Sequence, residues 1–244
     1  MGILLAVGVA ATGARTLVGL ATLAERHDHA TFGFAGKLLV VDADGSSLRI
    51  SPGPPDTVEV DRDVYHDVQR PRLAENLDGN RLLLRAQCPN FMVVRCESRY
   101  QVRVPPNVDL QVVNMTGPVR VSGMLGAVDI RSDDSITLDG ARGKVRLRSD
   151  DGSIRASGLR ATEVEARSGS GRVSLQLAIP PSLVNARSDD NDVLVVVPKG
   201  PEIYHVDASS TDGRTTNDLR TDPDSPLRIT ATSGSGDVIL RSSG

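Results

Sequence analysis

The sequence predicts an all-β protein, a stacked β-repeat solenoid or flattened β-helix with two short strands in each coil. Segments of about 20 residues repeat after position 105, and apolar residues alternate with polar ones inside each segment. Aromatic residues make up only 2% of the chain. An interior of Val, Leu, Ile and Ala suits thin stacked layers better than a wide core. We expect the solenoid to occupy residues 106–244.

An apolar segment opens the chain. Residues 1–24 carry one charge, Arg15, and residues 3–23 could cross a hydrocarbon layer as a helix. We therefore expect an N-terminal membrane helix and a single-pass protein of the cell membrane with an extracytoplasmic β domain. Cleavage of a signal peptide after Ala14, with secretion, is one alternative, and a buried helix of a cytosolic domain is another. Because Arg15 is costly in a membrane and no basic segment precedes the run, we expect the encoded start upstream of Met1.

Two regions lie between this segment and the repeats. Residues 25–36, which include His27 and His29, are predicted to be a polar linker rather than a metal site. Residues 37–105 are predicted to be a non-repeating β cap, or irregular first coils of the stack, that shield its open end. Strand-like runs at 37–41, 48–50, 57–60, 81–85 and 100–104 are separated by turn residues such as Asp44-Gly45 and Asp78-Gly79.

Cys88 and Cys96 are the two cysteines of the chain. A hairpin of the flanking runs, 81–85 and 100–104, would bring them to a separation that a disulfide spans. An even count in an exported chain favours one bridge, whereas a cytosolic chain would hold two buried thiols. We predict a structural disulfide between Cys88 and Cys96.

An aligned serine marks each copy of the repeat. These serines are Ser132, Ser149, Ser168, Ser188, Ser210 and Ser233, and Asn114 begins a weaker first copy. A cluster of Ser, Asp and Gly separates two alternating apolar runs, which predicts strand, turn and strand in each copy. About three or more copies must stack to bury their apolar faces. The spacing of the serines grows along the chain, which indicates longer outer turns or wider coils towards the C-terminus.

The repeat resembles a bacterial, largely actinobacterial, family of putative adhesins, a β-strand-repeat domain of unknown function. The resemblance rests on the Ser-Gly-Ser-Gly-x-Val turns at 168–173 and 233–238, the run 100–105 and the Cys88/Cys96 pair. It covers roughly residues 37–241. The family implies an all-β coil, often behind an N-terminal membrane segment, and has no catalytic motif to carry over. This chain departs from it by lacking a basic N-terminus and by Asp-Asp in several turns.

Acidic residues of the turns are the candidates for a metal or catalytic site. They would stack along one edge and could bind calcium: Asp133, Asp134, Asp150, Asp151, Asp189 and Asp190. The favoured alternative is that turns require Asp and that nearby arginines neutralise the row. A polysaccharide-cleaving carboxylate pair is disfavoured because sugar-gripping aromatic residues are scarce. We expect no catalytic residue, no cofactor and no resident metal.

Composition and motifs together favour an interaction protein. A net charge of −3 and the scarcity of aromatics argue against nucleic-acid binding. We expect a non-catalytic cell-envelope protein, an adhesin or surface interaction module whose partner is a surface protein or envelope component. The alternative is a membrane-tethered sensing or scaffold module of an envelope-stress system, followed by a glycan-active β-helix enzyme.

Overall fold

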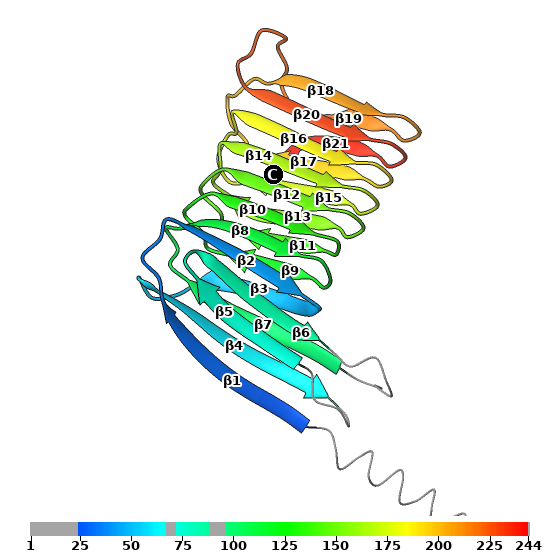
Figure 1. Cartoon of the computed structure of the whole chain (residues 1–244). Coiled ribbons are helices and arrows are strands. Elements are labelled where there is room, and N and C mark those ends of the chain that lie inside the picture. Colours follow the sequence, from blue (N-terminus) through cyan, green and yellow to red (C-terminus); the bar gives the residue numbers. More distant parts are fainter. Residues whose placement is uncertain (1–23, 67–71, 88–95, 244) are drawn as a thin grey trace, which may run out of the picture.

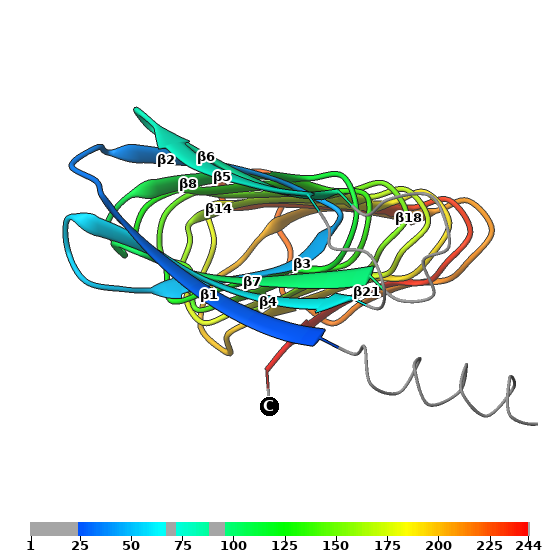
Figure 2. The same ribbon diagram turned by 60° about the horizontal axis from the view of Figure 1, so that its bottom comes forward.

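The computed structural model describes residues 24–66, 72–87 and 96–243, which form strands and no helix. An 11-stranded sheet (sheet A) faces a 10-stranded sheet (sheet B) (Figures 1 and 2). In spatial order sheet A contains β1 (Ala24–Gly33), β4 (Thr57–His66), β7 (Cys96–Val104), β3 (Ser46–Pro52), β9 (Val119–Ser122), β11 (Ile136–Asp139), β13 (Ile154–Leu159), β15 (Val173–Leu177), β17 (Val193–Val197), β21 (Val238–Ser242) and β19 (Thr215–Asn217). Sheet B contains β18 (His205–Ser210), β20 (Arg228–Ser233), β16 (Leu183–Ser188), β14 (Glu163–Ser168), β12 (Val145–Ser149), β10 (Val128–Ser132), β8 (Asp109–Asn114), β2 (Leu38–Asp44), β6 (Arg81–Gln87) and β5 (Arg72–Asp78). The predicted all-β class is confirmed for the described residues.

From β8 to β17 the strands alternate between the two sheets. Each strand from β8 to β15 pairs in parallel with the strand two places later, as β10 does with β12 and β11 with β13. We call one strand of sheet B and the next strand of sheet A a repeat unit. Figure 1 shows these units stacked on one another.

Aliphatic side chains in register fill the space between the sheets. Val128, Val145, Val164 and Val184 are successive partners in sheet B, and Ile130, Leu147, Ala166 and Ala186 form the next row. None of these side chains is more than 2% exposed. Burying one Val, Leu or Ile side chain stabilises a fold by about 1.5–3 kcal/mol. The alternation in the sequence therefore places one side chain of each pair in the core and the next on the outer face.

The aligned serines connect neighbouring units. Ser168 pairs with Ser149 and with Ser188 in sheet B, as the alignment predicts. The Ser168 hydroxyl donates to the carbonyl of Gly152 in the preceding turn at 2.8 Å and accepts from the amide of Gly171 at 2.9 Å. A Cβ on Gly171 would lie 2.2 Å from the Gly152 carbonyl oxygen, so this turn packs too closely for a side chain there. Serine and glycine thus recur because the turns stack directly.

The order of units in space differs from the order in sequence at the C-terminal end. The last unit, β20–β21, lies between β16–β17 and β18–β19, so β18 and β19 are the outermost strands. The last two serine spacings, from Ser188 to Ser210 and from Ser210 to Ser233, include residues 198–204 and 218–227, which connect these displaced units. The wider coils considered from the spacing are not needed, because β16, β18 and β20 pair residue for residue.

An ionic cluster closes the other end. Arg62 on β4 is only 7% exposed and pairs with Asp28 on β1 and with Glu75 on β5. Because β4 belongs to sheet A and β5 to sheet B, these contacts join the two sheets where the aliphatic core ends. Tyr100 packs into the same end, and burial raises its pKa to about 12, which keeps the phenol neutral.

Two sequence-based predictions for residues 25–105 are wrong, and the structure decides between two alternatives for a third. The linker predicted for 25–36 is largely β1, which pairs along its whole length with β4. β2 and β3 pair in parallel with β8 and β9, so residues 38–52 belong to the stack, as the alternative of irregular first coils predicts, and not to a separate cap. The predicted hairpin is absent, because β6 lies in sheet B and β7 in sheet A. β6 instead forms a hairpin with β5 across Gly79, whose φ is +58°.

Two further predictions fall mainly outside the described residues. Cys88 lies outside the described residues, so the disulfide between Cys88 and Cys96 stays a prediction. The membrane helix predicted within residues 1–24 also lies there, except for Ala24 at the start of β1. Among the residues that the structure describes, no helix is long and apolar enough to span a membrane.

Candidate functional site

The predicted row of turn carboxylates is interrupted in the structure. The turns that carry Asp133 and Asp150 are neighbours, but the Gly169-Ser170 turn separates them from the turn of Asp189. Asp134, Asp151 and Asp190 are exposed in the same turns. Asp189 is bound by Arg187 at 2.7 Å and by Arg167 at 3.3 Å, and these hydrogen bonds lower its pKa although partial burial acts in the opposite direction. Among the described residues, no group of three or more His, Cys, Asp or Glu side chains could hold a metal ion.

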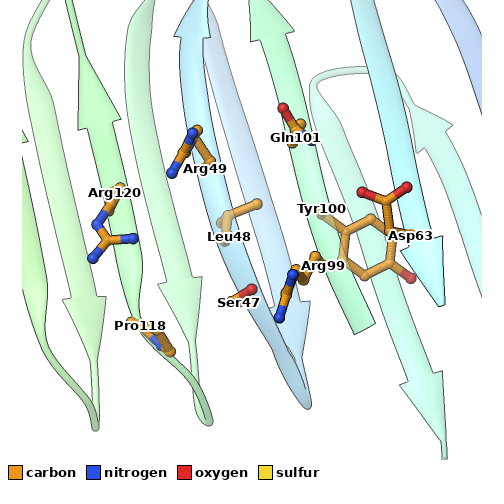
Figure 3. Close-up of a pocket in the computed structure, with 9 residues that line it drawn as sticks. All are labelled: Ser47, Leu48, Arg49, Asp63, Arg99, Tyr100, Gln101, Pro118 and Arg120. Carbon is orange, nitrogen blue, oxygen red and sulfur yellow. The ribbon is translucent and has the colours of Figure 1, made fainter. Parts of the chain in front are cut away.

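A hollow of about 400 Å³ lies on the outer face of sheet A, over β3, β4, β7 and β9. Three arginines reach it from adjoining strands: Arg49 from β3, Arg99 from β7 and Arg120 from β9. Arg49 is the direct partner of Arg120 on one side and of Gln101 on the other (Figure 3). The other residues that line the hollow are Ser47, Leu48, Asp63, Tyr100 and Pro118. Strand alternation explains why five of the lining residues lie on the outer face. The residues at outward positions are Ser47, Arg49, Arg99, Gln101 and Arg120.

Among the residues that the structure describes, two of the three guanidinium groups in the hollow lack a carboxylate partner. Arg99 pairs with Glu97 at 2.9 Å and lies over the Tyr65 ring at 5.3 Å from its centroid. Within the described part of the chain, no carboxylate pairs with Arg49 or Arg120. Like charges on directly paired strand positions repel each other. An anion between these two guanidinium groups would remove that repulsion and could accept charge-assisted hydrogen bonds from both.

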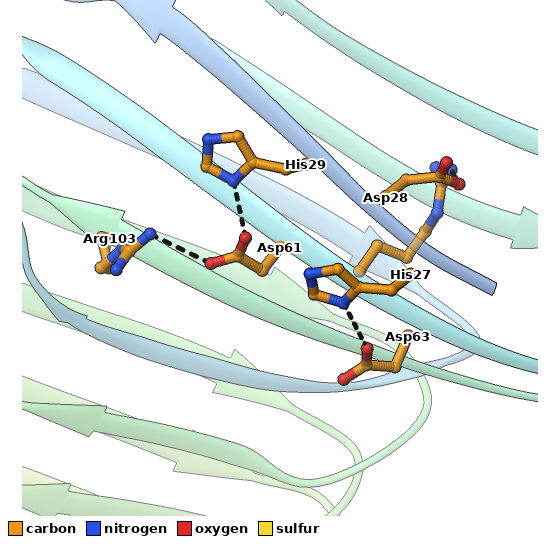
Figure 4. Close-up of polar contacts among 7 residues, drawn as sticks. His27, Asp28, His29, Asp61, Asp63 and Arg103 are labelled. Carbon is orange, nitrogen blue, oxygen red and sulfur yellow. Dashed lines mark hydrogen bonds and ion pairs between the residues drawn. The ribbon is translucent and has the colours of Figure 1, made fainter. Parts of the chain in front are cut away.

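The carboxylate that lines the hollow is already engaged. Asp63 accepts a hydrogen bond from Nδ1 of His27 at 2.7 Å, and this contact raises the pKa of His27 above its ordinary value (Figure 4). His29 makes the matching contact with Asp61 at 2.6 Å, and Arg103 also pairs with Asp61 at 3.2 Å. These contacts link β1, β4 and β7 along the outer face of sheet A. They give Asp61 and Asp63 partners other than Arg49 and Arg120.

Several arginines of the opposite face are paired with carboxylates. Arg148 and Arg167 on sheet B pair with Glu165 at 3.0 Å and with Asp189 at 3.3 Å, respectively. Arg148 and Arg146 lower the pKa of Glu165 against the effect of its partial burial. Neutralisation of the turn row by arginine, as the sequence indicates, therefore applies at Asp189.

No family model matches this chain, and no curated protein matches it. Similar solved structures include a putative cell adhesion protein from Clostridium sporogenes, 9% identical with a TM-score of 0.37, covering 90% of this chain and 100% of that one. A putative adhesin from Bacteroides fragilis is 14% identical with a TM-score of 0.39, covering 89% and 97%. Another from Parabacteroides merdae is 10% identical with a TM-score of 0.30, covering 90% and 97%. These descriptions name bacterial adhesins without showing an actinobacterial origin, and at this level of similarity they assign no function to this chain.

Sequence reasoning missed the hollow on sheet A. Arg49, Arg99 and Arg120 lie in segments that the repeat alignment does not connect, and each looks like an ordinary outward residue of a strand. One signal was present: Arg49 and Arg120 each stand between apolar residues, in Leu48-Arg49-Ile50 and Val119-Arg120-Val121. Only the pairing of β3 with β9 brings the two side by side.

Proposed function

We propose that this chain is a non-catalytic interaction module of the cell envelope, a rigid β-solenoid that captures an anionic group of its ligand on sheet A. The observation that carries this proposal is that Arg49 and Arg120, at directly paired strand positions, line a hollow of about 400 Å³ and have no carboxylate partner among the described residues. Ser47 and Gln101 add polar contacts beside the guanidinium groups. Adhesion to an acidic surface component is the function that this arrangement supports best.

The rigidity of the site supports binding by a preformed surface. Arg49 and Arg120 lie on strands whose neighbouring residues, Leu48, Ile50 and Val121, are at most 2% exposed in the core. The backbone under the hollow is therefore held by packing and by parallel pairing on both sides of β3. A preformed site loses less conformational entropy when the ligand binds.

The lining of the hollow favours binding over glycan cleavage. Glycoside hydrolysis uses two carboxyl groups placed on either side of the scissile bond. Asp63 is the carboxylate among the lining residues, and it is bound by His27. This supports the non-catalytic proposal. If the chain were instead a glycan-cleaving enzyme, it would hydrolyse a glycan and Asp63→Asn would abolish that hydrolysis.

We place the β domain outside the membrane, with residues 3–23 as the tether. β1 begins at Ala24 and is the edge strand at one end of sheet A. A tether there would hold this end of the stack nearest to the membrane and direct β18 and β19 away from it (Figure 1). Protease shaving of intact cells should release fragments of residues 106–244, whereas full protection would contradict the extracytoplasmic placement.

Anion capture can be tested by NMR titration of the β domain with galacturonate and with inorganic phosphate. We expect Arg49→Gln/Arg120→Gln to weaken binding of at least one anion by about tenfold, since charge-assisted hydrogen bonds contribute about 1.5–3 kcal/mol. Arg131→Gln is the matched control, because Arg131 is exposed on the opposite face. High salt should also weaken binding. Equal affinities in the double variant and the control would refute the proposal.

A further inference from the structure

A row of outward side chains extends the hollow across sheet A. Arg120 on β9 pairs with Thr137 on β11, Thr137 pairs with Arg155 on β13, and Arg155 pairs with Ser174 on β15. With Gln101 and Arg49 on the other side, these residues form one line across six strands, which we call the basic stripe: Gln101, Arg49, Arg120, Thr137, Arg155 and Ser174. Strands lie about 4.8 Å apart, so the stripe is about 24 Å long.

A second hollow lies at the far end of the same line. It has a volume of about 270 Å³ and is lined by Arg155, Arg172, Ser174, Ser153, Ile154 and Asn191. Thr137, a small polar residue, separates it from the first hollow. The two hollows are therefore placed to receive successive parts of one extended ligand.

The charged residues of the basic stripe are all positive. Its three arginines are Arg49, Arg120 and Arg155, and none of its six residues is acidic. No ion pair binds Arg155 within the described part of the chain, whereas Arg172 beside it pairs with Asp192 at 2.5 Å. An anionic ligand on the stripe would therefore meet guanidinium groups that need not first release an internal partner.

We propose that the basic stripe binds a linear acidic polysaccharide laid across the strands, with its carboxylates on the arginines. This rests on the proposed capture of an anionic group at Arg49 and Arg120. Hydroxyl and amide groups lie beside the arginines on the stripe, at Gln101, Thr137 and Ser174, and they suit the hydroxyl groups of sugars. A single-stranded nucleic acid is the less suitable occupant, because the stripe offers no aromatic ring for base stacking.

The test is a length series of galacturonate oligomers of one, two, four and six residues. Contacts along the stripe should add up within one ligand, so affinity should rise with oligomer length. In Arg155→Gln we expect the ratio of hexamer to monomer affinity to fall by about tenfold. Arg131→Gln on sheet B should leave the ratio as in the unaltered protein, and unchanged denaturation midpoints should show that both variants fold.

The outcomes separate the stripe from the capture site. If monomer binding depends on Arg49 and Arg120 but affinity does not rise with length, or Arg155→Gln has no effect on the ratio, the stripe is refuted and the capture site stands. If neither monomer nor hexamer binding responds to Arg49→Gln/Arg120→Gln, the proposed function itself fails. If oligothymidylate or polyphosphate of equal charge binds as tightly as the hexamer, the assignment to a polysaccharide is overturned.

Discussion

Each aligned serine makes one hydrogen bond within its own turn and one to the turn of the neighbouring unit. In Ser188 the hydroxyl accepts from the amide of Asn191 at 3.0 Å and donates to the carbonyl of Gly171 at 2.8 Å. Ser149 and Ser233 make the same two bonds. Alanine would fit the space but would leave the amide and the carbonyl without these hydroxyl partners. The residue type is therefore set by hydrogen bonding rather than by packing.

Ser168→Ala should lower the free energy of unfolding by about 1–3 kcal/mol, because Ser168 is fully buried and both of its partners would be left unsatisfied. Chemical denaturation measures this change. Ser170→Ala is the control, since Ser170 is exposed two residues further along the same turn. Equal stabilities of the two variants would show that the serine contacts do not hold the units together.

β1 and β5 are the strands that sequence reasoning did not find. The inward side chains of β1 include Asp28, and those of β5 include Glu75, and both pair with Arg62. An ionic interior contact removes the apolar alternation by which a half-buried strand is recognised in a sequence. β1 is one edge of sheet A and β5 is one edge of sheet B. Charged side chains at a sheet edge protect against pairing with another chain.

The contact of β1 with β4 should depend on pH through His27. Its folded-state pKa is raised by Asp63, so the contribution of the pair is present below the ordinary pKa of about 6.5 and is lost as pH rises through the raised value. NMR titration should give His27 a pKa above that of the unfolded chain, and Asp63→Asn should lower it. The same pKa in both proteins would contradict the His27–Asp63 contact.

At the scale of the whole molecule, stability comes from contacts between neighbouring units. Each inner unit pairs with one unit on either side, in the same register, through both sheets. Stacked repeats of this kind behave approximately as a sum of unit and interface energies. One unit can therefore be removed without disturbing the pairing pattern of the others.

Deletion of residues 132–148 would join Arg131 to Ser149 and remove one unit, since Ser132 and Ser149 occupy the same register position. β10 could then pair with β14, and β9 with β13. We expect a folded protein with the β-type circular dichroism of the full chain and a lower denaturation midpoint. A shifted junction, deleting residues 131–148, breaks the alternation and should not fold. Failure of both deletions to fold would contradict the independence of the units.

The local pattern of the sequence was sufficient for the all-β class, for most strands and for the register of the serines, because alternation and turn residues act over a few neighbouring positions. The order of the units was not encoded in that pattern. Any unit with the same inward alternation can stack on another, and the tertiary structure buries Ile229 and Ala231 while leaving Val206 and Ala208 half-buried at the end of the stack. The arginine hollow has the same origin. Arg49 and Arg120 become neighbours only when β3 and β9 pair, and that contact between distant segments depends on the whole fold.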